Sequence, residues 1–451
     1  MTLRTLLHKR TLSIVAALLF VAGGCQKQSA SDPSSSSQTS RAQIESEGEL
    51  GPLRRLALLP VTDGRPVDAL ITRLQEQIRR IPDKTDPWIE LGRAWIRKAR
   101  ENSEPGYYLQ ADACASVVLA HETENAAALN LRGLVLLNNH RFAEAEALAR
   151  RIVANRDFDP MAWGTLSDAL LEQGRIEEAE AAVKKMIEQK PSLPSYSRAS
   201  YLAFLRGSSA AAKELIRLAI DAAPNSRGNA EPRAFALVQA AQMFFLEGDY
   251  SGADAGFVLA LQAMPDYPPA LVGRGQVALS EGRYAEAEQL LLRAYQLSPL
   301  AETAWHLGDA RTMQRKDQDA ASAYADLLRI GRRTDPRTVA LFLAIENRDL
   351  QQAQELIDRE RSGRNDLYTQ DVYAVVLSRR GHHTEAQRSI DGILAVGVRD
   401  PRFLYHGAII HHAAGNKARA HALLQQLLKQ SPHFDVIAEP IAQRLALELA
   451  S

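Results

Sequence analysis

Cysteine is scarce: only Cys25 and Cys114 occur among the 451 residues. Two cysteines cannot form a disulfide framework, and a structural zinc site needs about four ligands. We therefore expect neither disulfide bonds nor a structural zinc site to stabilise the fold. Aromatic residues are also few, at 6% of the chain, whereas leucine and alanine are abundant. This composition favours helices over a sheet sandwich. We therefore predict an all-α protein that is held together by packing.

The chain has no excess of either charge, with 54 Lys and Arg against 54 Asp and Glu. Nucleic-acid-binding proteins usually carry a clustered excess of basic residues, so we expect no nucleic-acid partner. The sequence also lacks the phosphate-binding patterns GxxxxGKS/T and GxGxxG, the zinc-protease pattern HExxH and the hydrolase pattern GxSxG. These absences predict a protein that is not an enzyme and that takes no cofactor and no metal.

The amino terminus has the pattern of a secretion signal. Basic residues between Arg4 and Arg10 precede an apolar run over residues 12–22, and small residues follow. The run is too short to span a bilayer, which takes about 20 apolar residues. Its ending, Val21-Ala22-Gly23-Gly24-Cys25, resembles the lipobox of bacterial lipoproteins. One departure is Ala22, where that family usually has Leu.

The resemblance implies that residues 1–24 are a lipoprotein signal peptide and that Cys25 is acylated, with palmitate among its chains. Gln26 after the cysteine implies the periplasmic face of the outer membrane in a Gram-negative bacterium. The alternative is an ordinary signal peptide cut near Gly24, which leaves Cys25 as a chance residue. In the lipoprotein interpretation, residues 25–50 are the acylated cysteine and a flexible tether. Eight of the residues in 26–50 are serine and only two are large and apolar, so this segment cannot bury enough surface to fold.

The main feature of the sequence is an internal repeat. Each of six glycines ends an amphipathic segment, has an alanine five residues later and, in five of the six cases, has a proline twelve residues beyond that alanine. Glycine accepts the positive φ that ends a helix, a small residue lets two helices approach closely, and proline stops the second helix. The glycines are Gly174, Gly207, Gly248, Gly282, Gly381 and Gly415.

This pattern resembles the tetratricopeptide repeat (TPR) family, whose unit is a helix-turn-helix of 34 residues. The resemblance implies a right-handed α-solenoid of about ten repeats with helical caps. Units are expected to start near 85, 126, 160, 193, 234, 268, 301, 334, 367 and 401. We predict a capping helix in 51–84, repeats 1–4 in 85–228, repeats 5–10 in 229–432 and a second capping helix in 433–451. Turn-rich insertions lie near 102–106 and 225–229, and the second could separate two sub-arrays.

The concave groove is the expected binding surface, since the first helix of each TPR unit lines it. Aromatic, Arg and Gln residues, which are typical of binding hot spots, occupy the groove positions of units four, five and seven. The alternative is that some of them pack against the next turn of the superhelix. The candidate partner-binding residues are Arg198, Tyr201, Phe204, Phe235, Gln239, Gln242, Phe245 and Trp305.

Histidine and the second cysteine are expected to have no chemical role. Seven of the eleven histidines lie in 382–433, but the repeat register points them in different directions, which argues against a metal site. Cys114 falls on a repeat helix, where a lone cysteine is usually a packing residue.

These inferences lead to one main functional hypothesis and two alternatives. The main hypothesis is a lipid-anchored periplasmic scaffold that binds protein or peptide partners in its groove, in envelope assembly or secretion. The first alternative is a non-catalytic accessory subunit of a glycan synthase or transferase complex. The second is a soluble TPR co-chaperone, which requires the signal to be spurious.

Overall fold

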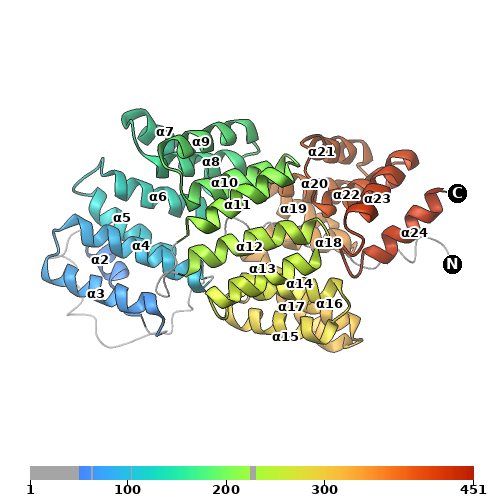
Figure 1. Cartoon of the computed structure of the whole chain (residues 1–451), viewed down its shortest axis with the longest axis horizontal. Helices are drawn as coiled ribbons and strands as arrows, with labels where there is room; N and C mark the ends of the chain where they lie inside the picture. Colours follow the sequence, from blue (N-terminus) through green and yellow to red (C-terminus); the bar gives the residue numbers. More distant parts are fainter. Residues whose placement is uncertain (1–49, 62–63, 103, 224–229, 451) are drawn as a thin grey trace. The chain divides into compact units, whose positions relative to one another are not determined.

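The structure is a computed structural model that describes residues 50–61, 64–102, 104–223 and 230–450. The described residues form 23 α-helices and one short 3-10 helix, and they include no β-strand (Figure 1). This confirms the predicted all-helical solenoid. The expected signal peptide, Cys25 and the tether lie outside the described residues. No helix in the described ranges is both long enough and apolar enough to cross a membrane.

Ten consecutive helix pairs make up most of the described chain, and they follow the predicted units in order. We call the first helix of each pair helix A and the second helix B. The pairs are α4 (Thr85–Asn102) and α5 (Tyr108–Leu119), α6 (Ala126–Asn138) and α7 (Phe142–Asn155), α8 (Pro160–Glu172) and α9 (Ile176–Gln189), α10 (Leu193–Leu205) and α11 (Ser209–Asp221), α12 (Glu231–Leu246) and α13 (Tyr250–Ala263), α14 (Pro268–Ser280) and α15 (Tyr284–Leu297), α16 (Ala301–Met313) and α17 (Asp317–Thr334), α18 (Pro336–Ile345) and α19 (Leu350–Arg361), α20 (Leu367–Arg379) and α21 (His383–Ala395), and α22 (Pro401–Ala413) and α23 (Lys417–Gln430).

Further helices flank the ten pairs at both ends. Before them lie α2 (Gly51–Ala57) and α3 (Pro66–Arg80), and α24 (Glu439–Ala450) follows them. Helix α3 packs on α4, and α24 packs on α23. These helices cover faces of the first and last pairs, as capping helices do in a solenoid.

The turn between helix A and helix B requires a left-handed backbone residue. Gly174, Gly207, Gly248, Gly282, Gly381 and Gly415 all have positive φ between 70° and 88°. In units two and seven the same position holds His140 and Arg315, whose φ values are 57° and 59°. The turn is therefore kept even where its residue has a Cβ, which L-residues tolerate at a cost in this region.

Small residues bring the two helices of a unit into close contact, as the repeat pattern predicts. Ala179, Ala253 and Ala287 have no exposed surface. A Cβ added to Gly275 on α14 would lie 2.6 Å from Cγ of Leu291 on α15. These positions are therefore close contacts between the two helices of a unit.

By their internal contacts the described residues divide into two compact units, one ending at Leu166 and the other beginning at Ser167. We call them the N-terminal unit (described residues 50–166) and the C-terminal unit (described residues 167–450). The division falls within α8. The insertion at 225–229, where the sequence suggested a break, lies outside the described residues.

Candidate functional site

The predicted partner-binding residues lie on three helices of the C-terminal unit. Helix α10 carries Arg198, Tyr201 and Phe204, α12 carries Phe235, Gln239, Gln242 and Phe245, and α16 carries Trp305. The structure thus places seven of the eight on the helices A of two consecutive repeats. Arg198 and Phe235 are half-buried, and the other six are buried. Their role in partner binding stays a prediction.

We call the surface formed by these groove positions the inner face. Residues from distant repeats cover it, which agrees with the alternative that the groove residues pack against another turn of the superhelix. The side chain of Tyr201 contacts Tyr368 on α20. Phe204 and Phe245 belong to one hydrophobic cluster with Tyr405 on α22 and Phe434 before α24. The helices A of units four and five are therefore packed against the last two repeats and the region that follows them.

Arg198 is engaged within the protein. Its guanidinium Nε and Nη2 donate to the two carboxylate oxygens of Asp168 on α8, at 2.8 Å and 2.5 Å. A bidentate pair of this kind is among the stronger side-chain interactions. The arginine predicted to donate to a peptide backbone is thus already held by a carboxylate.

The C-terminal unit closes on itself through three turns that follow α8, α10 and α12 at Gly174, Gly207 and Gly248. Each turn faces chain about 180 to 190 residues later: the loop before α20, the loop before α22, and the C-terminal end of α23. We call this set of contacts the closure. It joins units three, four and five to the segments that begin units nine and ten and to the end of unit ten.

The first contact of the closure joins the end of α8 to the loop before α20. The backbone N–H of Asn365 donates to the carbonyl of Glu172 at 2.8 Å. A Cβ added to Gly174 would lie 2.5 Å from the carbonyl oxygen of Asn365. Glycine is needed here both for the positive φ and for the space.

The second contact is the tightest. A Cβ added to Gly207 would lie 2.3 Å from the carbonyl oxygen of Gly397, and a Cβ on Gly397 would lie 3.3 Å from the carbonyl oxygen of Arg206. Two glycine backbones therefore face each other at van der Waals distance. Gly397 precedes Val398, which stands where the other glycine-marked units have proline. This departure from the repeat is a sequence signal that could have pointed to the loop.

The third contact joins α12 to the C-terminal end of α23. The hydroxyl of Ser431 donates to the carbonyl of Leu246 at 3.0 Å. A Cβ added to Gly248 would lie 2.8 Å from the carbonyl oxygen of Gln430. Because Ser431 is buried, its hydroxyl satisfies a helix-end carbonyl that water does not reach.

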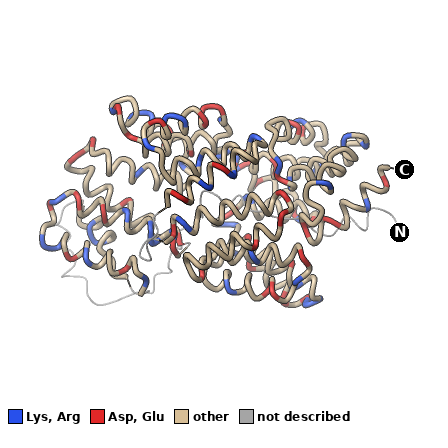
Figure 2. Tube along the Cα trace, in the orientation of Figure 1, with Lys and Arg blue, Asp and Glu red and all other residues tan. Residues whose placement is uncertain are grey.

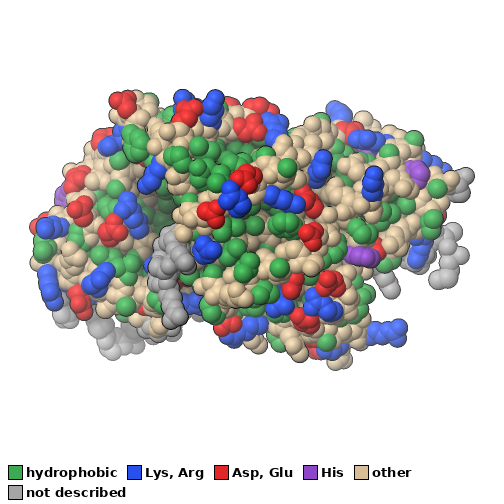
Figure 3. Space-filling model, in the orientation of Figure 1, with side chains coloured by type: hydrophobic (Ala, Val, Ile, Leu, Met, Phe, Trp, Pro, Cys, Tyr) green, Lys and Arg blue, Asp and Glu red, His purple; other side chains and the backbone are tan. Residues whose placement is uncertain are grey.

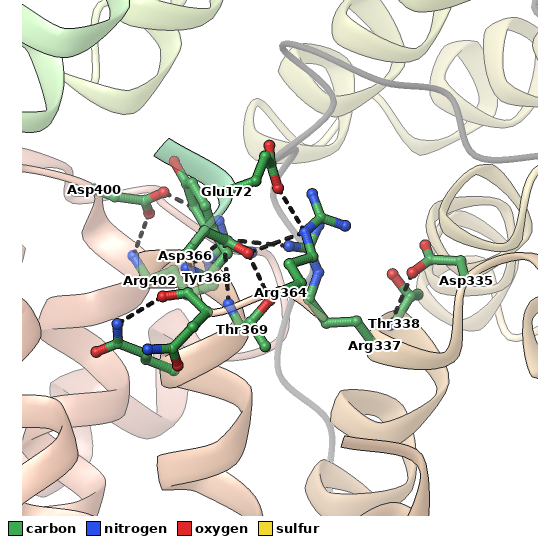
Figure 4. A network of polar contacts seen from close by, with 12 residues as sticks. Glu172, Asp335, Arg337, Thr338, Arg364, Asp366, Tyr368, Thr369, Asp400 and Arg402 are labelled. Carbon is green, nitrogen blue, oxygen red and sulfur yellow. Dashed lines mark hydrogen bonds and ion pairs between the residues drawn. The ribbon is translucent and has the colours of Figure 1, made fainter. Parts of the chain in front are cut away.

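An ionic network lies at the first contact (Figure 4). Nε of Arg364 is 2.7 Å from Oε2 of Glu172 and 3.0 Å from Oδ2 of Asp366. Nη1 of Arg337 is 3.4 Å from Oδ1 of Asp366. Asp366 also accepts from the hydroxyl of Thr369 at 2.6 Å. Two arginines and two carboxylates thus compensate one another where the chain closes.

Burial and charge act in opposite directions on the two carboxyl groups. Burial raises the pKa of Glu172 above its ordinary value, even though Arg364 lowers it. Burial also acts to raise the pKa of Asp366, but Arg364 and Arg337 outweigh it and hold that pKa below the ordinary value. The two arginines thus favour the ionised form of Asp366.

Several polar side chains on the inner face have a buried atom without a hydrogen-bond partner. They occupy groove positions on α12, α14 and α22. Such atoms are uncommon in folded proteins, because each loses its hydration without replacement. The atoms are Oε1 of Gln239, Nε2 of Gln242, Oε1 of Gln276 and Nε2 of His406.

The histidines and Cys114 are arranged for packing. Nδ1 of His406 is 2.8 Å from Oδ2 of Asp371, and Nε2 of His411 is 3.0 Å from Oδ1 of Asp391. Burial lowers the pKa of His306 to about 4. Among the described residues no group of three or more potential metal ligands gathers. Burial raises the pKa of the Cys114 thiol, which suppresses the reactive thiolate.

A comparison with protein families agrees with this geometry. The family model described as tetratricopeptide repeat matches residues 108–160, 130–194, 244–302 and 374–433. These segments, which together are less than half of the chain, are similar to tetratricopeptide repeats. The matched segments fall in both compact units, so TPR packing accounts for helix pairs on either side of the division in α8.

The chain is also similar in sequence to a known plant protein. It is 25% identical over 210 residues to the protein CTR9 homolog of Arabidopsis thaliana, which covers 43% of this chain and 19% of that protein. The match thus spans about a fifth of the length of that relative.

Two solved structures are among those similar to the chain. A tetratricopeptide repeat protein from Parabacteroides merdae is 15% identical, covers 57% of this chain and 98% of its own, and has a TM-score of 0.41. The human IFIT1 dimer, solved with m7Gppp-AAAA, is 15% identical, covers 73% of this chain and 77% of its own, and has a TM-score of 0.47.

Proposed function

We propose that the chain is a non-catalytic TPR scaffold that binds protein or peptide partners, and that a lipid on Cys25 holds it at the periplasmic face of the outer membrane. The observation that carries the proposal is the stack of ten helix pairs, which fills nearly all of residues 85–430. Such solenoids present extended surfaces for binding other proteins. The envelope location rests on the resemblance of residues 21–25 to a lipobox.

Charge and exposure support a protein partner over a polyanion. Acidic and basic side chains are mixed along the described chain (Figure 2). In Figure 3 charged side chains of both signs are scattered over the visible face, and apolar side chains gather in continuous stretches between them. The exposed large apolar residues of the described chain include Phe158, just before α8, and Met161, within it. A mixed surface of this kind suits a protein partner, whereas a nucleic acid requires a basic patch.

The lipid anchor has a direct test. We expect wild-type protein to incorporate labelled palmitate and to sediment with membranes, because several acyl chains make anchoring stable. Cys25→Ser is expected to abolish labelling and to release the protein to the soluble fraction. Cys114→Ser, which alters the buried second cysteine, is the matched control and should sediment like wild type. Wild-type protein found in the soluble fraction would contradict the anchor.

Partner binding by the inner face has a second test. Tyr201→Ala is expected to weaken the affinity for a partner recovered from solubilised envelope by about thirtyfold, since truncation of a central aromatic anchor costs about 2 kcal/mol or more. Tyr201→Phe, which keeps the ring, should retain most of the affinity.

The free energy of unfolding must be measured beside the affinity, because Tyr201 is buried against Tyr368. If affinity falls only as far as the folded fraction falls, Tyr201 is a packing residue and the binding role is refuted. An unchanged affinity in a fully folded variant would refute it as well.

A further inference from the structure

The two helices before the first repeat carry a local surplus of basic residues. Residues 51–84 contain seven Lys and Arg against four Asp and Glu, whereas the rest of the chain contains 47 against 50. Among the described residues of this segment, the exposed acidic ones are Glu76 and Asp83. The exposed basic ones are Arg55, Arg73, Arg79, Arg80 and Lys84. The surface of this cap is therefore positive, on a chain that is otherwise slightly acidic.

Two large apolar side chains are exposed beside these charges. Leu59, after α2, is 44% exposed, and Ile81, after α3, is 43% exposed. Nε2 of Gln75 on α3 donates to the carbonyl of Leu59 at 2.8 Å, so Leu59 lies beside the C-terminal half of α3. Six residues separate Gln75 from Ile81, which is about 9 Å along a helix axis. Arg79 lies between them along that axis.

The backbone next to each of these apolar residues is fixed to the first repeat. Nε1 of Trp95 donates to the carbonyl of Ala57 at 3.0 Å, and Nε1 of Trp88 donates to the carbonyl of Pro82 at 2.9 Å. Both tryptophans are on α4 and are buried. The exposure of Leu59 and Ile81 is therefore not the result of a frayed chain end.

Apolar side chains next to Lys and Arg are the combination that proteins use to bind at membrane interfaces. The apolar groups enter the boundary between headgroups and acyl chains, and the basic groups pair with lipid phosphates. We call this set of exposed residues the cap patch. It consists of Leu59, Arg73, Arg79, Arg80, Ile81 and Lys84.

We propose that the cap patch binds the anionic phospholipid surface of the membrane that anchors the chain. The proposal rests on the proposed acylation of Cys25. The 25 residues from Gln26 to Leu50 span at most about 90 Å even when fully extended, and the cap is the first described part of the chain after them. An anchor at Cys25 thus keeps the cap patch within that distance of the lipid headgroups.

Tethering explains why a small surplus of charge is sufficient. A short connection raises the effective concentration of the second binding partner, so a contact that is weak by itself becomes occupied. The acyl chains hold the protein at the membrane, and the cap patch determines which end of the N-terminal unit faces it. The proposal thus adds orientation to anchoring.

A fluorescent label at residue 59 tests the contact directly. Leu59→Cys is introduced into the full chain with Cys25→Ser and labelled with nitrobenzoxadiazole, which fluoresces more strongly in apolar surroundings. Because Cys114 is buried, the label attaches at residue 59. We expect the emission to rise and shift to the blue on vesicles of equal parts phosphatidylglycerol and phosphatidylcholine, but not on phosphatidylcholine alone. Leu259→Cys, at a residue of α13 that is 49% exposed, is the matched control and should not respond.

Two triple variants test the role of charge. One changes three exposed arginines of the cap patch to glutamine, and the control changes three exposed arginines of the C-terminal unit. We expect the first to raise the vesicle concentration needed for half of the fluorescence change about a hundredfold, since each Lys or Arg near an anionic surface contributes about fivefold. The control should bind like the unsubstituted chain. The two sets are Arg73→Gln, Arg79→Gln and Arg80→Gln, and Arg359→Gln, Arg388→Gln and Arg444→Gln.

Three results would overturn the proposal. The first is no response of the label at residue 59 to either kind of vesicle, and binding of polyglutamate in that case would assign the cap patch to an acidic protein. The second is an equal response to the two kinds of vesicle. The third is equal weakening by the two triple variants.

The anchor and the cap patch can fail independently in these experiments. The vesicle assay uses Cys25→Ser protein, which lacks the proposed acylation site, whereas palmitate labelling of the wild-type protein tests the anchor. A wild-type chain that takes up palmitate, together with a silent label at residue 59, would refute the cap patch alone. A responding label without palmitate uptake would refute the anchor alone.

Discussion

Asp68→Asn is expected to lower the free energy of unfolding of the N-terminal unit by about 3–5 kcal/mol. Oδ1 of Asp68 on α3 lies 2.6 Å from Nζ of Lys98 on α4, and the lysine side chain has no exposed surface. Asparagine keeps the shape and can still accept the backbone N–H of Arg65, as the aspartate does at 3.0 Å. What it removes is the negative charge of an ion pair with a buried ammonium group.

A double variant separates charge from packing in this prediction. Lys98→Met fills similar space without a charge, so Asp68→Asn combined with Lys98→Met should recover most of the lost stability, because apolar replacements of buried ion pairs are often neutral. Urea denaturation followed by circular dichroism gives the free energies. A double variant as unstable as Asp68→Asn alone would show that the loss of this ion pair is not the cause.

Trp305→Ala is expected to have a similar effect on the C-terminal unit, at about 3–5 kcal/mol. Trp305 is 1% exposed, and its ring meets that of Phe342 edge to face, with 5.1 Å between the centroids. Truncation removes a large buried surface and leaves a cavity between α16 and α18. Trp305→Phe is the matched control and should cost less, since it keeps an aromatic ring in contact with Phe342.

The same variant bears on the groove hypothesis, which named Trp305 as a partner-binding residue. Calorimetric melting and denaturant unfolding give its effect on stability. A melting temperature equal to that of wild type would contradict the packing role and return Trp305 to the candidates for partner contact.

The repeat units could be predicted from the sequence because their spacing depends on local chemistry. Helix α10 begins at Leu193 and α14 at Pro268. These are the starts that the glycine, alanine and proline positions predicted for units four and six. The two largest differences also have local causes. Helix α12 begins at Glu231, three residues before the predicted start, and α18 begins at Pro336, two residues after it; each has proline in its first two positions, which favours helix initiation there.

The closure could not be predicted, because it depends on how small rotations between neighbouring units add up over six repeats. Gly207 and Gly415 hold the same position of the repeat, yet one faces a carbonyl and the other meets no atom within 4 Å. Nothing within a single unit distinguishes them. The burial of Tyr201 and Gln242 depends on the same sum of rotations between units. The residue types at the groove positions therefore predicted which residues lie on the inner face, but not which later repeats cover it.

The contact between Gly207 and Gly397 alters how the array tolerates changes in length. The stability of an ordinary solenoid is approximately a sum of nearest-neighbour terms, so units can be added or deleted with local effects. Here two backbones 190 residues apart must meet, which fixes the number of units between them. Deleting one repeat between α11 and α22 would carry Gly397 past its partner turn. The C-terminal unit therefore has the length constraint of a ring, although the repeats that build it are those of an open chain.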